Sequence, residues 1–134
     1  MNLPELKIGK LVAQVPIIQG GMAIRLSTAP LAAAVANEGG IGLIAASGMG
    51  IDELRKEIRM ARELTGGKGI IGINAMVAAR QFLDLITTAA EEGIDLIVAG
   101  AGFSRDIFAV GRRYGVEVVP IVSSARLAQT AEKL

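Results

Sequence analysis

The sequence predicts an α/β fold in which parallel strands alternate with helices, and three observations lead to this prediction. Five short apolar runs recur along the chain, and a helix-length interval follows each of them. Amphipathic patterns of helical period fill these intervals. Each apolar run ends in residues that are small, glycine-rich or polar. Because the connections are short, strands in this order are expected to be parallel and joined by right-handed crossovers.

The five apolar runs are expected to be strands that are covered on both faces. Over most of their length they lack the alternation of polar and apolar residues that a half-exposed strand shows. Pro120 lies inside the last run and counts against a central strand there, because proline cannot donate a ladder hydrogen bond. Valines and isoleucines surround it, so we keep the strand prediction. The expected strands are residues 15–19, 41–46, 70–75, 95–100 and 116–122.

Five helices are expected, one after each strand. The first begins at Ser27 or Thr28, carries Pro30 in its first turn and ends at Gly39. In the second helix the apolar residues form one stripe, and Asp52 is the expected N-cap. The expected helical segments are residues 27–40, 51–64, 80–93, 104–115 and 123–134.

The composition argues against several classes of function. The chain has 134 residues, a formal net charge of +1, one tyrosine and no tryptophan, so we expect no nucleic-acid partner. Without cysteine or histidine it can form no disulfide, none of the usual zinc sites and no Ser-His or Cys-His nucleophile pair. No apolar stretch reaches the ~20 residues of a membrane helix, and the first residues do not resemble a signal peptide. We therefore expect a cytoplasmic protein with no membrane partner.

Two architectures fit this order of elements: an open doubly wound sheet, or part of a (β/α) barrel. A complete barrel needs eight strands and about 250 residues. The chain has five expected strands, and its last helical pattern is still in period at Leu134. We therefore expect residues 1–134 to form a single incomplete (β/α) barrel domain, the N-terminal half.

The candidate site lies where the strands end, because parallel α/β folds collect their chemistry at the carboxyl ends of the strands. Gly20 and Gly21 would let the backbone approach a flat ligand, and Met22 would add a polarizable apolar contact. Alternatively, the two glycines only form a tight turn and Met22 belongs to the core. Asn74 is the one amide at a strand end within apolar surroundings, and either loop backbone or the polar edge of a ligand satisfies it.

Another glycine-rich strand end, Gly100–Gly102, precedes an expected helix and has two possible interpretations. It could be an anion nest at a helix N-terminus. The pattern favours the other interpretation, a turn followed by a cap at Ser104, and the third glycine of a dinucleotide fingerprint is missing. No general acid or base stands out, since the carboxylates lie on helix faces or begin strands, as Asp95 and Glu117 do.

Five segments together resemble the nitronate monooxygenase (2-nitropropane dioxygenase-like) family, which also includes FMN-dependent enoyl-acyl-carrier-protein reductases. The resemblance runs in order over nearly the whole chain, through "VPIIQGGMA", "LAAAVANEGGIGLIAASGM", "GINAMV", "DLIVAGAGFSRDIF" and "GVEVVPIVSSARLAQTAEKL". It implies a TIM (β/α)8 barrel, here its N-terminal part, with FMN as cofactor at the carboxyl-end mouth. It further implies that Gly20, Gly21 and Met22 line the flavin and that Asn74 hydrogen-bonds it. The residues implied to border the substrate are Ser47, Gly48, Gly100, Ala101 and Gly102.

The family's Gly-Gly-His-type motif and its phosphate-seating glycine loops have no counterpart in this sequence. We therefore name no catalytic residue and no metal ligand. The expected function is the oxidation of a small-molecule substrate, an alkyl nitronate, with O2, and an FMN-dependent enoyl-acyl-carrier-protein reductase is the alternative. A third possibility is a half-barrel without catalysis that self-associates. An open sheet has two exposed edges, so we expect a homo-oligomer.

Overall fold

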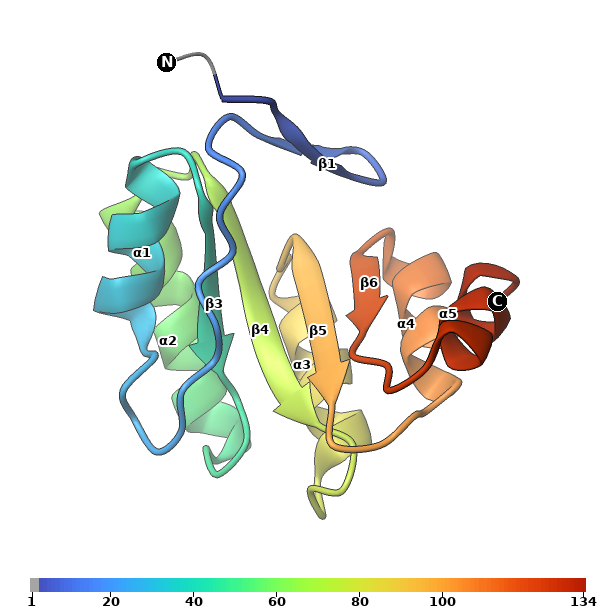
Figure 1. Ribbon diagram of the computed structural model, residues 1–134. Coiled ribbons are helices and arrows are strands. Elements are labelled where there is room, and N and C mark those ends of the chain that lie inside the picture. Colours follow the sequence, from blue (N-terminus) through green and yellow to red (C-terminus); the bar gives the residue numbers. More distant parts are fainter. Residues whose placement is uncertain (1–2) are drawn as a thin grey trace.

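The computed structural model describes residues 3–134, and its centre is a parallel sheet of four strands in the order β3-β4-β5-β6 (Figure 1). Each strand pairs with the next one in the sequence, so every connection is a crossover through a helix. The order confirms the predicted alternation of parallel strands and helices. The strands are β3 Ile41–Ala45, β4 Ile70–Met76, β5 Leu96–Gly100 and β6 Glu117–Pro120.

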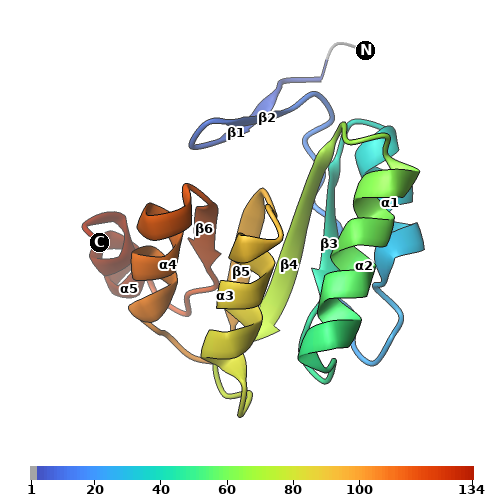
Figure 2. The ribbon, with the colours of Figure 1, turned by 180° about the vertical axis from the view of Figure 1, so that it is seen from behind.

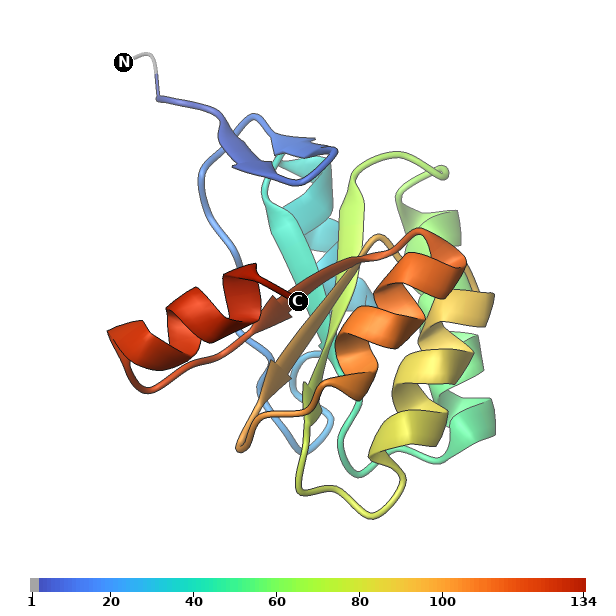
Figure 3. The same cartoon turned by 90° about the vertical axis from the view of Figure 1, so that its right-hand side faces the viewer.

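The helices α1 to α4 form a layer over one face of this sheet. Figure 2 shows α2, α3 and α4 side by side in front of the strands, with α1 beside α2. Figure 3 shows the same layer on one side of the sheet, whereas the N-terminal hairpin and α5 lie on the other. The helices are α1 Ala29–Asn37, α2 Ile51–Leu64, α3 Phe82–Glu91, α4 Asp106–Tyr114 and α5 Ala125–Glu132.

The first expected strand, residues 15–19, joins the sheet only through a single β-bridge between Ile18 and Ile41. The Ile41 amide donates to the Ile17 carbonyl at 2.9 Å, and the Gln19 amide donates to the Ile41 carbonyl at 3.0 Å. Pro16 has no amide to donate. Beyond Gln19 the ladder stops, because the Gln19 side chain rather than a backbone carbonyl accepts the Leu43 amide, at 3.1 Å.

An antiparallel hairpin of β1 (Leu6–Ile8) and β2 (Leu11–Ala13) precedes this segment and was not predicted. Its turn contains Gly9 at a φ of 53°, a left-handed conformation that favours glycine. The hairpin lies at the end of the sheet opposite the strand tips (Figure 1). There its apolar side chains pack against buried residues of the sheet, namely Ile41, Leu43, Leu96 and Val98.

The strands bury both faces unequally, and this difference creates the site. On β4, Ile71, Ile73 and Ala75 belong to the large core beneath the helices. Alternation along a strand directs Gly72, Asn74 and Met76 to the opposite, inner face. The hairpin covers this inner face near the amino ends of the strands, whereas Met76 near the carboxyl ends is 44% exposed.

The helix boundaries agree with the predictions except at the caps. The segment 51–64 is helical as predicted, but its N-cap is Gly50 and Asp52 lies in the first turn. The N-cap of α1 is Thr28, whose side chain makes no cap hydrogen bond. Instead the Ala29 amide donates to Glu57 of the neighbouring helix at 2.6 Å. Within residues 3–134, none of the helices is long and apolar enough to cross a bilayer.

Candidate functional site

The predicted site residues come from different loops that meet at one end of the sheet. Residues 20–22 precede α1, Ser47 and Gly48 follow β3, and Asn74 lies on β4. Gly100 ends β5, and residues 101 and 102 follow it. The parallel ladder places the ends of β3, β4 and β5 at the same edge, because Ala45 pairs with Asn74, and Met76 pairs with Gly100. The structure thus brings the predicted residues together at the carboxyl-end mouth.

Gly21 lies directly against Asn74. A Cβ atom added to Gly21 would lie 2.4 Å from the Asn74 Cβ and 2.8 Å from its Cγ, so only glycine allows this approach. A Cβ atom on Gly20 would meet nothing within 4 Å, so this residue borders open space. Met22 is 46% exposed, so the alternative that Met22 belongs to the core is wrong.

Asn74 presents an amide that the rest of the described chain does not use. Its backbone carbonyl accepts the Ala46 amide at 2.9 Å, but its side chain makes no hydrogen bond with any of residues 3–134. The side chain is only half-buried, on the inner face of the sheet. Loop backbone therefore does not satisfy it, and its donors and acceptor are free for a ligand.

A buried polar cluster, missed by the sequence analysis, holds the glycine loop in place. Ser27 is fully buried, and its hydroxyl accepts the Met22 amide at 2.9 Å and the Gln19 side-chain amide at 2.8 Å. The same hydroxyl donates to the Gly20 carbonyl at 3.2 Å. Two polar residues flanking a glycine pair were the available signal, but their mutual contact depends on the folded loop.

The other anchor of this loop is an ion pair. Arg25 donates to Glu53 on α2 through two nitrogens, at 2.8 and 3.1 Å. Hydrogen bonding to Arg25 lowers the pKa of Glu53, and the same bond to Glu53 raises the pKa of Arg25. Arg25 itself adopts a φ of 56°, an uncommon conformation for a residue with a side chain. The loop therefore enters α1 in a defined geometry.

The loop after β3 is tied to β4 by Ser47. The Ser47 hydroxyl accepts the Met76 amide at 2.8 Å, which joins the ends of two neighbouring strands. Gly48 follows at a φ of 88°, and a Cβ atom there would meet nothing within 4 Å. This side of the mouth is therefore built from small residues and is open.

The Gly100–Gly102 segment forms a turn, but the cap expected at Ser104 is not formed, because the N-cap of α4 is Arg105 and its side chain makes no cap hydrogen bond. The Gly100 carbonyl accepts the Val77 amide at 2.8 Å, and a Cβ atom on Gly100 would lie 2.9 Å from Ile121. Beyond the turn, the Ser104 hydroxyl accepts the Asp106 amide at 3.1 Å and donates to its carboxylate. The arrangement disfavours an anion nest, because the Asp106 carboxylate lies in the first turn of α4 and would repel an anion there.

The mouth combines apolar contact surface with neutral polar groups. Three large apolar side chains near the strand ends stay about half exposed: Met22, Met76 and Ile121 at 46%, 44% and 56%. None of the nine predicted site residues carries an ionisable side chain. An arrangement of this kind can hold and orient a flat ligand, but it supplies no general acid or base of its own.

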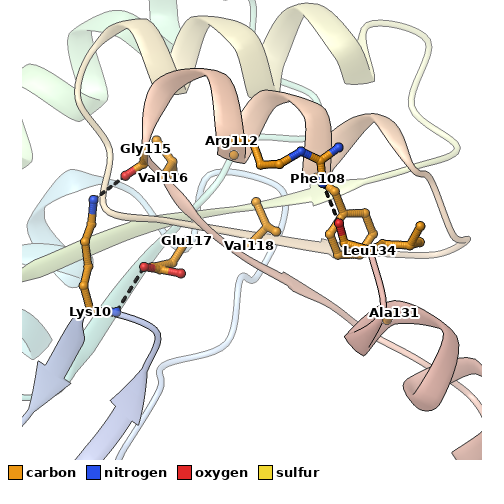
Figure 4. Close-up of a pocket in the computed structure, with 10 residues that line it drawn as sticks. Lys10, Phe108, Arg112, Gly115, Val116, Glu117, Val118, Ala131 and Leu134 are labelled. Carbon is orange, nitrogen blue, oxygen red and sulfur yellow. Dashed lines mark hydrogen bonds between the residues drawn. The ribbon is translucent and has the colours of Figure 1, made fainter.

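A pocket of about 430 Å³ lies elsewhere, between the hairpin turn, β6, α4 and α5 (Figure 4). Its polar groups already have partners in the chain. The Lys10 side chain donates to the Gly115 carbonyl, the Lys10 amide donates to Glu117 at 3.1 Å, and Arg112 donates to the Leu134 carbonyl. Because it adjoins the amino end of β6, this pocket is separate from the mouth.

Comparisons with known proteins agree with this arrangement. The family model of nitronate monooxygenase matches residues 5–104. FabK from Thermotoga maritima superposes with a TM-score of 0.84 at 34% identity, over 90% of this chain and 38% of that chain. Nitroalkane oxidase from Streptomyces ansochromogenes superposes with a TM-score of 0.78 at 23% identity, over 90% of this chain and 44% of that one. The latter similarity concerns the fold alone.

A curated relative from Mycobacterium tuberculosis, named as an octahydro-indene-carboxyl-CoA dehydrogenase, is 27% identical over 114 residues. The match covers 85% of this chain and 31% of the relative, so the chain spans about a third of these proteins' length. FabK and the nitroalkane oxidase are TIM-barrel proteins. The chain therefore belongs to the nitronate monooxygenase family and has the fold of the N-terminal part of a TIM (β/α)8 barrel.

Proposed function

We propose that the mouth binds the isoalloxazine ring of FMN and that the chain provides the ring-binding part of an FMN-dependent oxidoreductase. The observation that carries this proposal is that Gly21 lies against Asn74. The side-chain amide of this asparagine has no hydrogen-bond partner among residues 3–134. Glycine at this position lets a backbone segment and a carboxamide lie side by side. A flat heteroaromatic ring with hydrogen-bonding edges is the type of ligand that matches such a surface.

The residues present fit the ring of the cofactor. Among residues 3–134, the amides of Gly20 and Gly21 have no hydrogen-bond acceptor, and the Asn74 side chain has no partner. Met22 and Met76 offer soft apolar surface to the ring. The nearby cation Arg25 is already paired with Glu53, so it is not a free anchor for the phosphate.

When bound, FMN supplies the redox chemistry, and the protein positions it and tunes its electronics. Asn74 would donate to or accept from the ring edge, and residues 20–22 would lie along its plane. The small residues on the other loops would border the substrate; they are Ser47, Gly48, Gly100, Ala101 and Gly102. With no ionisable group among them, these side chains act by shape and hydrogen bonding rather than by proton transfer.

For the substrate, we propose an alkyl nitronate with O2 as the electron acceptor. The match to the nitronate monooxygenase model and the small mouth loops support a small substrate. The second candidate is an FMN-dependent enoyl-acyl-carrier-protein reductase, and the 34% identity with FabK favours it. We also propose that residues 1–134 act as one incomplete barrel domain that self-associates, because the outer edge of β6 has no partner strand among residues 3–134.

Flavin binding is tested by titrating the purified chain with FMN and following the quenching of flavin fluorescence. Asn74→Ala is expected to weaken binding about five- to tenfold, the value of one or two hydrogen bonds. Asn37→Ala is the matched control, because its side chain lies on the surface and bonds to the Leu64 carbonyl instead. If the unchanged chain binds no FMN, or if both variants bind equally well, the proposal is wrong.

The two candidate activities are distinguished by mixing the FMN-loaded chain anaerobically with the reactants of each. A nitronate monooxygenase loses flavin absorbance on addition of an alkyl nitronate without any nicotinamide. A reductase instead loses it with NADPH or NADH and regains it with an enoyl thioester. A chain that binds flavin but responds to neither would support the non-catalytic half-barrel.

A further inference from the structure

The Ser27 hydroxyl has a role that the proposed flavin contacts do not use. A serine hydroxyl offers one donor and two acceptor positions. Here the donor serves the Gly20 carbonyl, and the acceptors serve Met22 and Gln19. All three partners lie in or next to the glycine loop, and Ser27 is fully buried. One hydroxyl thus fixes both ends of the segment 20–22.

The same cluster connects the glycine loop to the sheet. The Ser27 carbonyl accepts the Ala45 amide at 2.9 Å, and the Gln19 side-chain oxygen accepts the Leu43 amide at 3.1 Å. Gln19 also donates to the Gly20 carbonyl. Both residues therefore attach the loop to β3, and the neighbouring strand β4 carries Asn74. The distance between the loop and Asn74 is set through these bonds.

The inward hydrogen bonds leave the loop's other face free. The carbonyls of Gly20 and Met22 and the amide of Met22 bond to Ser27, whereas the amides of Gly20 and Gly21 have no acceptor among residues 3–134. Glycines have the largest conformational freedom of all residues. Without an internal clamp, two consecutive glycines would have to be ordered by the ligand, and that entropy would be lost on binding.

We propose that Ser27 is a positioning residue whose hydroxyl pre-forms the Gly20–Met22 loop for the flavin ring. Gln19 supports Ser27 by holding the hydroxyl and the Gly20 carbonyl in one orientation. This inference rests on the proposed binding of FMN at the mouth, and it assigns no contact between Ser27 and the cofactor. Its effect is on affinity and ring environment, through the loop.

Ser27→Ala tests the inference, with Ser124→Ala as the matched control. Ser124 also uses its hydroxyl to accept a backbone amide, that of Leu127 at 3.2 Å, but it caps α5 after β6, at the opposite margin of the sheet from β3. At a temperature where both variants are folded, Ser27→Ala is expected to weaken binding of FMN and of lumiflavin, which has no phosphate, by about the same five- to tenfold factor. The visible circular dichroism of bound FMN should change with it, because the ring's surroundings change.

A readout without flavin completes the test. In the flavin-free chain, hydrogen exchange of the Met22 amide should become faster in Ser27→Ala and stay unchanged in Ser124→Ala. Ser27→Thr, which retains a hydroxyl, should restore slow exchange. If Ser27→Ala fails to fold, Gln19→Met takes its place, since it removes the supporting amide at nearly constant length, and it should weaken the binding of both flavins.

The outcomes separate this inference from the proposed function. If the unchanged chain binds both flavins and the variants bind them equally tightly with the same dichroism, Ser27 is not a positioning residue, while the flavin site stands. If the unchanged chain binds neither flavin, the proposed function fails and takes the inference with it. Faster exchange at Met22 without weaker flavin binding would also overturn it, because Ser27 would then order the loop with no effect on the binding of the ring.

Discussion

At the scale of single residues, the mouth depends on the absence of one side chain beside the presence of another. Gly21 has no room for a Cβ atom, because the Asn74 side chain occupies that space. Gly20, its neighbour, has open space instead. Packing therefore requires glycine at position 21 but not at position 20, and a pair of matched substitutions tests this difference.

Gly21→Ala is expected to lower the free energy of unfolding by about 1–3 kcal/mol, the usual cost of forcing a methyl group into a packed site. Gly20→Ala should change it by less than about 0.5 kcal/mol, as is typical of an open surface position. Urea unfolding of the flavin-free chain measures both values. Equal losses in the two variants would contradict the packing of Gly21 against Asn74.

The residues at strand ends could be predicted from the sequence, but their supporting contacts could not. Position at the carboxyl end of an apolar run was enough to select Gly20, Gly21 and Asn74. The contact between Gln19 and Leu43 joins residues 24 positions apart and uses a side chain in place of a strand carbonyl. The positions of Gln19 and Ser27 beside the glycines are visible in the sequence, but their contacts with each other and with β3 are visible only in the folded chain.

At the scale of elements, α2 holds its neighbours on both sides through charged side chains. Towards the glycine loop, Glu53 binds Arg25. Towards α3, Arg55 donates to Glu92 at 2.6 Å, and Arg59 donates to the same carboxylate at 2.7 and 2.9 Å. Hydrogen bonds from Arg59 and then from Arg55 lower the pKa of Glu92 to about 2. Through these contacts Glu53 and Glu92 have structural roles as partners in ion pairs.

The shared carboxylate predicts a defined pH dependence. Because the pKa of Glu92 in the folded chain lies below its ordinary value of 4.5, its ion pairs stabilise the fold fully above about pH 4.5 and lose their effect as the pH falls towards 2. Glu92→Gln should therefore lower the urea midpoint at pH 7 but leave it almost unchanged near pH 2.

Glu91→Gln is the control, because Glu91 makes only one contact with Arg55, at 3.3 Å, and is 44% exposed. Its loss at pH 7 should be clearly smaller, as expected for an exposed pair. If the two substitutions lower the urea midpoint equally at every pH, the geometry of the ion pairs does not matter.

Element boundaries followed the sequence where the pattern was long. The apolar stripe of α2 predicted residues 51–64, which are the observed bounds. The hairpin of residues 6–13 was missed because each of its strands has only three residues, too short for a period to be recognised. The first expected strand, 15–19, forms only a single bridge. Its apolar sequence pattern predicted a strand, but such a pattern cannot show whether ladder partners are available.

At the scale of the whole molecule, the sheet is open at both sides. Among residues 3–134, β6 has a neighbour on one side only, and the other margin is the segment 15–19. Ile17 on that margin is 57% exposed, although its own backbone bonds to the chain. Exposed edges and apolar side chains of this kind favour association with another strand. A second copy of the chain is the partner that we propose.

Ile17→Glu should reduce self-association, because a charge at the margin opposes pairing there. Light scattering at increasing chain concentration measures the mass. Leu83→Glu is the matched control, since Leu83 is 51% exposed on the outer side of α3 and belongs to neither margin. A chain that is monomeric throughout, or that responds equally to both substitutions, would exclude pairing along this margin.

The segment 15–19 directly precedes the glycine loop, and Gln19 contacts both the sheet and the loop. A second copy of the chain bound along the segment 15–19 would restrain the loop before FMN binds. Self-association and FMN binding would then be thermodynamically coupled. FMN affinity measured in dilute and in concentrated chain should then differ, with the tighter binding at high concentration. By reciprocity, saturating FMN would shift the assembly equilibrium towards the associated form, and identical affinities at both concentrations would show that the two events are independent.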